Sequence, residues 1–388
     1  MARKYRAEQV GSFLRPLHVR QAHQAQAEGR MSLEELRKIE DEAILKLLDM
    51  QKQVGIDVFS DGEMRRGGWA SEFSANVDGY VEGRPAVRLQ FHENPLAAAW
   101  REAHPEEVAT ALPNNAPAGA GARGVLGAPL SLKRRLTAHE SGFLKAHAPG
   151  PFKVTMPAAS YIVARGYNPE ISDKQFGNRA GLLKAVAGIV NSEIKALVDE
   201  GVPYIQLDNP HYPDYVVGER RDQWRAVGID PDKAVKEDVE ADNSCLEGID
   251  RSRVTIGMHF CRGNGGLGGW HTTGGYDRIA EDVFGSLAVD TLLLEYDSDR
   301  AGGFEPLRFV PKGKTVVLGL VTTKSGALEP QDLLLRRIDE ASKYVALEDL
   351  ALSPQCGFAS TFIGNPLTED EQRRKLQLVV DTARKVWK

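Results

Sequence analysis

The chain has 388 residues, a formal net charge of −5, 42% hydrophobic and 27% charged residues, a composition typical of a globular protein that buries a large core. Charges of both signs are mixed along the chain and the basic clusters are short, which argues against nucleic-acid binding. No apolar run reaches the roughly 18 residues of a membrane span, and the N-terminus lacks the apolar stretch of a signal peptide. We therefore expect a cytoplasmic protein with no nucleic-acid or membrane partner.

Short apolar runs rich in β-branched residues alternate with amphipathic stretches, a pattern typical of parallel strands covered by helices. The runs lie near residues 10, 60 and 155, and at 204–208, 254–261, 291–297, 315–322 and 350–357. Eight such runs predict an α/β fold, a (β/α)8 TIM barrel, formed by residues 1–388 as a single domain.

Helices are predicted between the strands. The first begins after the N-cap Ser32, where Glu35 completes a capping box, and the others are expected over residues 174–200, 329–346 and 368–387. The spacing of these segments matches the connections that a parallel sheet requires.

Residues 72–150 do not fit a plain barrel. They include a predicted hairpin at 80–91 and a Gly/Pro/Ala-rich loop at 114–125, whose composition is too flexible for a regular element. We interpret 72–150 as an insertion after the second strand that serves as a lid or as the contact of a homo-oligomer. A second long excursion follows the fourth strand, at 210–250.

Reactive groups of a TIM barrel lie at the carboxyl ends of its strands. Polar or metal-binding residues occupy that position after most of the predicted strands: Gly11, Ser12, Asp61, Gly62, Glu63, Asp208, His259, Cys261, Glu295 and Cys356. Stability of the fold alone does not explain so many polar strand ends.

His259 and Cys261 form the sharpest local feature. They are two residues apart on one predicted strand, so their side chains point the same way, and Glu295 and Cys356 end neighbouring strands. One nitrogen, two sulfurs and one carboxylate oxygen suit tetrahedral Zn²⁺, while the alternative is a packed strand end with a buried histidine and thiol. The remaining cysteine, Cys245, falls in a helical stretch and is expected to be structural.

The sulfur-rich ligand set predicts the chemistry of the ion. Thiolate ligands lower the Lewis acidity of zinc, so it stabilises a bound substrate thiolate better than it generates hydroxide. Glu295 is expected to be the weak ligand that gives way to the substrate sulfur. The sequence therefore predicts an enzyme that activates a small-molecule thiol for alkylation.

Motifs along the whole chain resemble a known family. They are VGSFLRP at 10–16, DGEMRR at 61–66, IQLDNP at 205–210, HFCRGN at 259–264 and SPQCGF at 353–358. With Glu295, they resemble the cobalamin-independent methionine synthases, specifically the C-terminal catalytic barrel and its short single-barrel members. The resemblance implies bound Zn²⁺, homocysteine as the thiol and a methylfolate donor, with the amino acid held at Val10, Gly11, Ser12, Glu63 and Asp208.

Two positions depart from the family pattern, and a third, Asp214, keeps the expected residue type. Where the family has a proton-donating histidine after the seventh strand, this chain reads VTTKS, which makes Lys324 the candidate catalytic acid, with His211 and His271 as alternatives. The tryptophan that stacks on the folate ring aligns near Val163. Asp214 stands where an acidic residue meets the pterin.

These residues predict methyl transfer to homocysteine giving methionine, with Asp208 and Lys324 as catalytic residues. The alternative is zinc-dependent addition of coenzyme M to epoxides, or another thiol alkylation; the sulfonate of coenzyme M would need cationic partners, for which Arg15, Arg65 and Arg66 are candidates. A third hypothesis is a thiol-binding or metal-binding protein without turnover.

Overall fold

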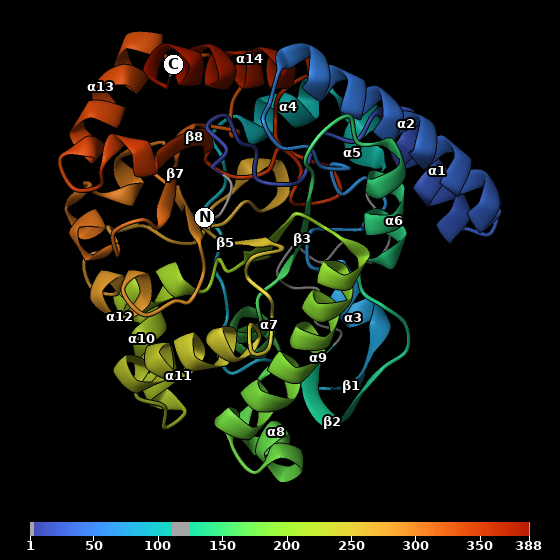
Figure 1. The fold of residues 1–388 in the computed structure, drawn as a ribbon. Coiled ribbons are helices and arrows are strands. Elements are labelled where there is room, and N and C mark those ends of the chain that lie inside the picture. Colours follow the sequence, from blue (N-terminus) through green and yellow to red (C-terminus); the bar gives the residue numbers. More distant parts are fainter. Residues whose placement is uncertain (1–3, 111–123, 388) are drawn as a thin grey trace.

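The computed structural model of the protein describes residues 4–110 and 124–387 (Figure 1). Six strands form one parallel sheet in the order β3-β4-β5-β6-β7-β8, so each strand pairs with the next one along the chain. Their bounds are β3 Lys153–Pro157, β4 Tyr204–Asp208, β5 Thr255–Phe260, β6 Thr291–Glu295, β7 Thr315–Val321 and β8 Leu350–Pro354. These are the last six of the eight predicted strands, and the α/β prediction is confirmed.

The first two predicted strands are reduced to single bridge residues. Ala7 pairs in parallel with Leu352 of β8, and Phe59 pairs in parallel with Phe152, directly before β3. The amide of Asp57 donates to the carbonyl of Ala7 at 3.0 Å, which joins the two segments to each other. The N-terminal segments therefore lie against both edge strands of the sheet, although neither forms a regular strand.

Helices surround the strands on the outside (Figure 1). In the described residues the α-helices are α1 Leu17–Ala27, α2 Leu33–Val54, α3 Ser71–Asn76, α4 Ala97–Ala103, α5 Pro105–Ala109, α6 Ala138–His147, α7 Ala159–Gly166, α8 Pro169–Phe176, α9 Arg179–Glu200, α10 Gly218–Ala226, α11 Pro231–Ser244, α12 Ala280–Phe284, α13 Gln331–Ser342 and α14 Glu369–Val386. Short 3-10 turns are η1 Tyr212–Val216, η2 Gly266–Gly268, η3 Asp299–Ala301, η4 Glu305–Phe309 and η5 Leu347–Asp349. No helix in these ranges has both the length and the apolar character needed to cross a membrane.

The capping box predicted at the start of α2 is confirmed. The Ser32 hydroxyl accepts from the amide of Glu35 at 3.2 Å, and the Glu35 carboxylate accepts from the amide of Ser32 at 2.9 Å. The helix ends at Gly55, whose φ of 87° is left-handed and favours glycine. The other predicted helices correspond to α8 with α9, to α13 and to α14.

The strand pairing in the segment 72–150 differs from the predicted hairpin at 80–91. Strand β1, Val77–Val81, pairs antiparallel with β2, Val125–Leu132, and residues 82–91 form no strand. These residues instead run toward the loop after β5, where His92 forms an antiparallel bridge with Trp270. Most of the Gly/Pro/Ala-rich loop predicted at 114–125 lies outside the described residues.

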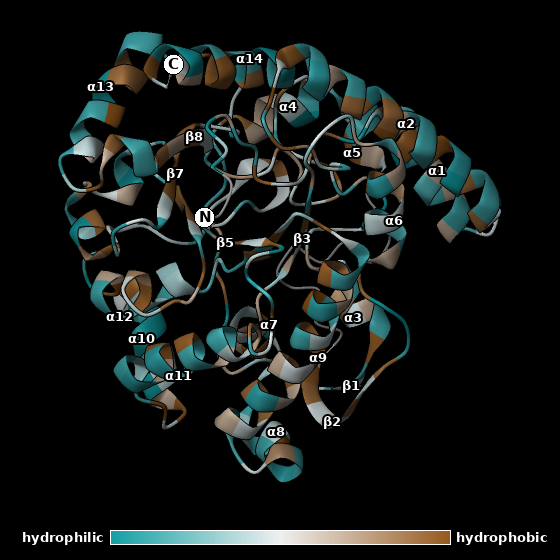
Figure 2. Cartoon of the chain, in the orientation of Figure 1, coloured by the Kyte–Doolittle hydropathy of each residue, from teal (hydrophilic) through white to brown (hydrophobic). Residues whose placement is uncertain are grey.

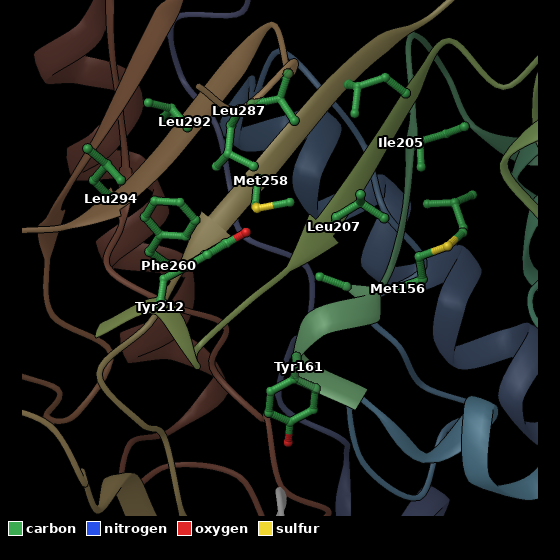
Figure 3. Packing of buried hydrophobic residues seen from close by; sticks show 14 of the residues in the cluster. Met156, Tyr161, Ile205, Leu207, Tyr212, Met258, Phe260, Leu287, Leu292 and Leu294 are labelled. Carbon is green, nitrogen blue, oxygen red and sulfur yellow. The ribbon is translucent and has the colours of Figure 1, made fainter. Parts of the chain in front are cut away.

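The six strands are buried on both faces, as expected for parallel strands covered by helices. On one face, side chains including Leu207, Met258 and Leu292 pack with the helices in the main core (Figure 3), and the helices turn hydrophilic residues outward (Figure 2). On the other face, apolar side chains form two small separate clusters, Tyr5 with Val58 and Tyr204, and Leu293 with Val317 and Ala351. Polar residues of that second face build the candidate site.

Candidate active site

The strand register brings the predicted site residues together. Side chains alternate along a strand, so Asp208 and His259 share a face, and the two are direct partners in the β4–β5 pairing. Thr155 on β3 lies beside Gln206 in the same layer of that face. Alternation along paired strands therefore brings Thr155, Gln206, Asp208 and His259 to the same face of the sheet.

His259, Cys261 and Cys356 form a buried group whose ligand atoms all lie within 4.8 Å of one another. The two sulfurs are 3.3 Å apart. The Nδ1 atom of His259 lies 3.2 Å from the carbonyl oxygen of Leu293, which orients the ring, and Nε2 is buried with no hydrogen-bond partner in the described residues. An unpartnered buried nitrogen beside two thiols indicates a site that could hold a metal ion.

The spacing of the sulfurs suits zinc with a small adjustment. Two zinc–sulfur bonds of about 2.3 Å at the tetrahedral angle put the sulfurs about 3.8 Å apart, slightly more than the 3.3 Å between Cys261 and Cys356. Rotation of either side chain covers the difference. The donor types, one imidazole and two thiols, are those that zinc prefers.

The charges in this group are unevenly distributed between the two thiols. The hydrogen bond with Cys261, helped by His259 and by the positive charge of Lys324, lowers the pKa of Cys356 well below its usual range. The same hydrogen bond, with burial, raises the pKa of Cys261. Burial alone would lower the pKa of His259, but its contact with Cys356 and the negative charge of Asp208 outweigh burial and raise it. The thiol of Cys356 therefore ionises more readily than the thiol of Cys261.

Glu295, the predicted fourth ligand, lies outside this group of three. Its Oε2 accepts from the amide of Arg262 at 2.7 Å, and its Oε1 lies 3.4 Å from the Arg300 guanidinium. Burial and the nearby Asp297 raise its pKa, against the opposing charges of Lys324 and Arg262. Its role as a ligand stays a prediction.

The group opens onto a pocket with about 530 Å³ of empty space, part of which is open to solvent. Among the described residues that line it, two are carboxylates, Glu63 and Asp208, and none is a lysine or an arginine. The lining residues among those described are Val10, Ser12, Glu63, Trp69, Leu89, Phe91, Tyr161, Asp208, Pro210, His259, Cys261, Gly263, Asn264, His271, Cys356, Gly357 and Ser360. The pocket thus combines soft donors, negative charge and aromatic surface.

Glu63 is held in a strained backbone position. Its φ of 55° is left-handed, and its amide donates to Oδ1 of Asp61 at 3.0 Å. Oε1 accepts from the Thr155 hydroxyl at 2.8 Å, while Oε2 is buried with no partner in the described residues. A Cβ added at Gly11 would lie 2.9 Å from Oε1, so glycine is needed there for the carboxylate to fit.

Asp208 is fixed by Gln206, whose amide nitrogen donates to Oδ1 of Asp208 at 2.7 Å and to the carbonyl of Val10 at 2.5 Å. The Lys153 ammonium donates in turn to Oε1 of Gln206 at 2.7 Å. Burial raises the pKa of Asp208 to about 7; His259 opposes the shift and the nearby Glu63 adds to it. The structure therefore joins the turn after the first predicted strand to the end of β4.

Val10 and Ser12 line the pocket as the sequence predicts, and the backbone of Gly11 lies between them. Ser12 is anchored on both sides, because its carbonyl accepts from the amide of Phe358 at 2.8 Å and its hydroxyl accepts from the amide of Ala359 at 3.3 Å. The turn is therefore tied to the segment that carries Cys356.

Lys324, Asp214 and Val163 are not among the lining residues. The Lys324 ammonium donates to the carbonyl of Gly263 at 2.8 Å and to Oδ1 of Asn264 at 3.2 Å. Asp214 is fully buried and ion-paired with Arg165 at 2.5 Å, and Val163 is fully buried in α7. Lys324 and Asp214 each contact a lining residue from behind, Lys324 at Gly263 and Asp214 at His271.

Sequence reasoning missed the aromatic wall. Trp69 and Tyr161 have ring centroids 4.6 Å apart, and Phe91 packs edge-on against His271 with centroids 5.1 Å apart. Figure 3 shows the ring of Tyr161 extending from α7 away from the strand side chains. The signal was weak, because these aromatics come from the segment around 67–91 and from the first turn of α7, where no motif singles them out.

Comparison with known proteins identifies the family. The model described as "Cobalamin-independent synthase, Catalytic domain" matches residues 6–93 and 171–385. The chain belongs to this family of cobalamin-independent synthases. The resemblance to cobalamin-independent methionine synthases inferred from the motifs is thereby confirmed.

Relatives in the cobalamin-independent synthase family extend along nearly the whole chain. The protein YxjG of Bacillus subtilis (strain 168), named as uncharacterized, is 37% identical over 389 residues, covering 99% of this chain and 95% of YxjG. The methionine synthase of Pyrococcus abyssi is 25% identical over 354 residues, covering 90% of this chain and 84% of that enzyme.

Two solved structures are similar in fold. A Listeria monocytogenes protein described as a candidate vitamin-B12-independent methionine synthase superposes with a TM-score of 0.69 at 28% identity, covering all of this chain and 99% of that one. A B12-independent methionine synthase from Shewanella sp. W3-18-1, solved with selenomethionine, gives a TM-score of 0.67 at 20% identity, covering 97% and 96% of the two chains. This chain therefore has the fold of that family.

Proposed function

We propose that this protein transfers a methyl group to the sulfur of homocysteine and so forms methionine, with Zn²⁺ held by His259, Cys261 and Cys356. One observation carries the proposal: a single pocket combines two thiols and an unpartnered imidazole nitrogen with two buried carboxylates, Glu63 and Asp208. A thiol amino acid presents the matching groups, a sulfur and an ammonium.

Zinc bound to this donor set would lower the pKa of the substrate thiol while keeping the sulfur nucleophilic. Glu295 is the candidate fourth ligand. Its carboxylate would have to leave the amide of Arg262, to which it is bonded at 2.7 Å, so it is the donor most easily replaced by a substrate sulfur.

Glu63 and Asp208 would bind the α-ammonium of homocysteine. Oε2 of Glu63 is buried without a partner in the described chain, and an ammonium would satisfy it. The positive charge would also favour the ionised form of Asp208, whose pKa burial raises to about 7. The backbone turn at Val10, Gly11 and Ser12 would receive the α-carboxylate, since peptide N–H groups are its natural donors.

The methyl donor would meet the aromatic wall of Trp69, Tyr161 and Phe91. A methylfolate presents a planar pterin, which stacks on such rings. Asp214, predicted to meet the pterin directly, reaches this wall only through His271, whose Nδ1 lies 3.1 Å away. We therefore assign Asp214 a positioning role.

Lys324 would hold the loop after β5 through Gly263 and Asn264, and it adds positive charge beside the two sulfurs. Its predicted role as proton donor to the leaving group would require the ammonium to leave both of these acceptors. That role stays a prediction, and the variants described below separate it from positioning.

The alternative substrate, coenzyme M with an epoxide, would meet no lysine or arginine among the described residues that line the pocket. Arg15 donates to the carbonyl of Glu63 at 2.6 Å, Arg65 pairs with Asp41, and Arg66 pairs with Glu140. All three predicted sulfonate partners are thus bonded to protein groups, and Arg66 also lies 3.4 Å from Oε1 of the lining residue Glu63. No observation on the described residues favours this reaction over methyl transfer.

We further propose that the chain is one domain, a closed (β/α)8 barrel with an insertion at 72–150. The parallel bridges of Ala7 and Phe59 to opposite ends of the sheet, and the bond between Asp57 and Ala7, support closure. The small apolar clusters on the face away from the helices are what the filled interior of such a barrel contains. The three free cysteines suit a reducing cytoplasm, and a homo-oligomer through the insertion stays part of this proposal.

The test is a turnover screen of zinc-loaded protein with homocysteine and with coenzyme M, each combined with methylfolate, simple methyl donors and small epoxides. Methionine formed from homocysteine and a methyl donor is the expected result. Consumption of an epoxide with coenzyme M, without methionine formation, would overturn the proposed function. Equal activity of protein freed of metal would contradict the role of zinc.

A further inference from the structure

His271 lies in the loop after β5, outside the candidate metal group, and its ring lines the pocket. The loop is anchored on both sides of this residue. The amide of His271 donates to the carbonyl of Arg262 at 2.9 Å, and the neighbouring Trp270 exchanges two backbone hydrogen bonds with His92, at 2.6 and 3.1 Å. Backbone hydrogen bonds therefore hold the main chain of His271 in place independently of its side-chain contacts.

The side chain of His271 rests on a carboxylate. Its Nδ1 lies 3.1 Å from Oδ1 of Asp214 and 2.9 Å from the Thr272 hydroxyl. That hydroxyl donates its hydrogen to the same Oδ1 at 3.0 Å, so its oxygen can only accept from Nδ1. The other oxygen, Oδ2, is 2.5 Å from Arg165 and 3.2 Å from Nδ1 of His211. Although burial would raise the pKa of Asp214, these partners hold it well below its usual range.

An ionised carboxylate only accepts hydrogen bonds, so Nδ1 of His271 carries the hydrogen and Nε2 carries the lone pair. The Cδ2 edge of the ring packs against Gly263, where an added Cβ would lie 2.4 Å from Cδ2. With Nδ1 against Asp214 and Cδ2 against Gly263, the remaining part of the ring is the tip that contains Nε2. This arrangement is the base–carboxylate pair of a catalytic triad, placed beside a thiol-binding site.

We propose that His271, oriented by Asp214, carries the proton of the incoming thiol to the leaving group of the alkyl donor; this inference rests on the thiol-alkylating function proposed above. First, the S–H bond breaks and the proton binds Nε2, leaving a thiolate and an imidazolium. The thiolate then attacks the alkyl carbon, a carbon–sulfur bond forms, and the bond to the leaving group breaks with its electron pair. The imidazolium finally protonates the leaving group, so one thiol and one donor give one thioether and one protonated leaving group.

The charges around His271 suit an imidazole that first accepts a proton and then donates it. Burial lowers the pKa of His271, the guanidinium groups of Arg165 in α7 and Arg220 in α10 act in the same direction, and Asp214 in η1 opposes them. The imidazole therefore enters neutral and can accept a proton. The Asp214 carboxylate then stabilises the imidazolium during the short time that it exists.

The test measures how many protons are released to the buffer when a thiol binds. Zinc-loaded wild-type protein and the variant H271Q are titrated calorimetrically with homocysteine and with coenzyme M in two buffers of different ionisation enthalpy at pH 7. For a bound thiol, the wild type is expected to release almost no proton, because His271 retains it, while H271Q releases about one. Turnover of H271Q with a methylated-amine donor should fall by about 10²–10⁴-fold, the usual loss when an acid–base group is removed.

A matched control is H23Q. His23 is another buried histidine on a carboxylate, with Nε2 3.0 Å from Glu40, but it lies on α1 away from the pocket lining, so this variant should keep the wild-type proton count. A second measurement needs only the wild type: below the lowered pKa of His271 the imidazole already carries a proton, so release should rise toward one as the pH falls.

The outcomes distinguish this inference from the proposed function. Homocysteine binding with the same proton count in H271Q and wild type would overturn the role of His271 and leave methyl transfer standing. Coenzyme M bound with its proton retained, and homocysteine not bound, would overturn homocysteine as substrate and support His271. Failure of both thiols to bind would overturn both.

Discussion

The two sides of the pocket are built in opposite ways. On the side of β5 and β8, Nε2 of His259 has no hydrogen-bond partner in the described residues. The sulfurs of Cys261 and Cys356 lie 3.3 Å apart, and each has one further polar contact, with the Gly263 amide at 3.2 Å and the Ser360 hydroxyl at 3.6 Å respectively. Beside this group, at the end of β4 and in the turn at 61–63, Asp208 and Glu63 each accept a hydrogen bond from a neighbouring donor, Gln206 or Thr155. Soft donors are left available for an ion, whereas the carboxylates that would recognise the substrate are held in place beforehand.

The largest effect is expected on the sulfur side. The variants C261S and C356S should each lose bound zinc and all turnover, because a hydroxyl is a much poorer ligand than a thiolate for this ion. Metal content per chain, measured by elemental analysis of purified protein, checks the loss.

The control for these variants is C245A. Cys245 is buried at the end of α11, where its sulfur bonds to the carbonyl of Ala241 at 3.4 Å. This variant should retain both metal and turnover. Unchanged zinc in C261S or C356S would show that the donor group has been misassigned.

The next effect concerns the carboxylate side in metal-free protein. Burial raises the pKa of Asp208 from 3.8 to about 7, so its favourable contribution to folding is present below 3.8 and is lost as pH rises to about 7. The variant D208N should therefore become more stable than wild type across this range, by up to about 4 kcal/mol at 1.36 kcal/mol per unit. Urea unfolding at a series of pH values measures the difference, and a difference that is constant with pH would contradict it.

Glu63 gives a test of substrate recognition. In E63Q the KM for homocysteine should rise about 10–100-fold, since a hydrogen bond to a charged group contributes about 1.5–3 kcal/mol, while the zinc content stays unchanged. The control is a thiol without an ammonium group, whose turnover should be unaffected. Equal losses with both thiols would instead indicate that Glu63 only maintains the structure around Gly11 and Thr155.

The smallest effect is expected for Lys324. If it positions the loop at Gly263 and Asn264, K324M should lower kcat about fivefold, equivalent to about 1 kcal/mol, without changing zinc content. The matched control K314M removes a lysine that likewise donates to two oxygens, here the backbone carbonyls of Phe284 and Leu287, away from the pocket. A loss of turnover as complete as in the cysteine variants would make Lys324 the proton donor.

The sequence was sufficient to predict which side chains lie together wherever alternation along a strand decides their direction. Alternation along β5 put His259 and Cys261 on one side, and the ends of β4 and β8 supplied Asp208 and Cys356 in the same region. The last six strands and the capping box of α2 were predictable for the same reason, because each depends on local pattern.

What could not be predicted depends on loops and on contacts between distant segments. The Glu295 carboxylate is turned toward the amide of Arg262, whose place is set by the loop after β5. His271 owes its orientation to Asp214, far earlier in the chain. The partner of β1 is β2 and not the nearer segment 82–91, because that segment instead runs toward Trp270 at the pocket.

The family model matches the residues of the pocket unequally. The unmatched stretch, residues 94–170, contains Thr155 and Tyr161, whereas Glu63 and the three candidate metal ligands lie in the matched parts. The unmatched stretch thus holds one of the three rings of the aromatic wall, while Trp69 and Phe91 lie in the matched parts. Sequence variation in that stretch would reach the wall through Tyr161 and the amino-acid site through Thr155, and it would leave the candidate metal ligands untouched.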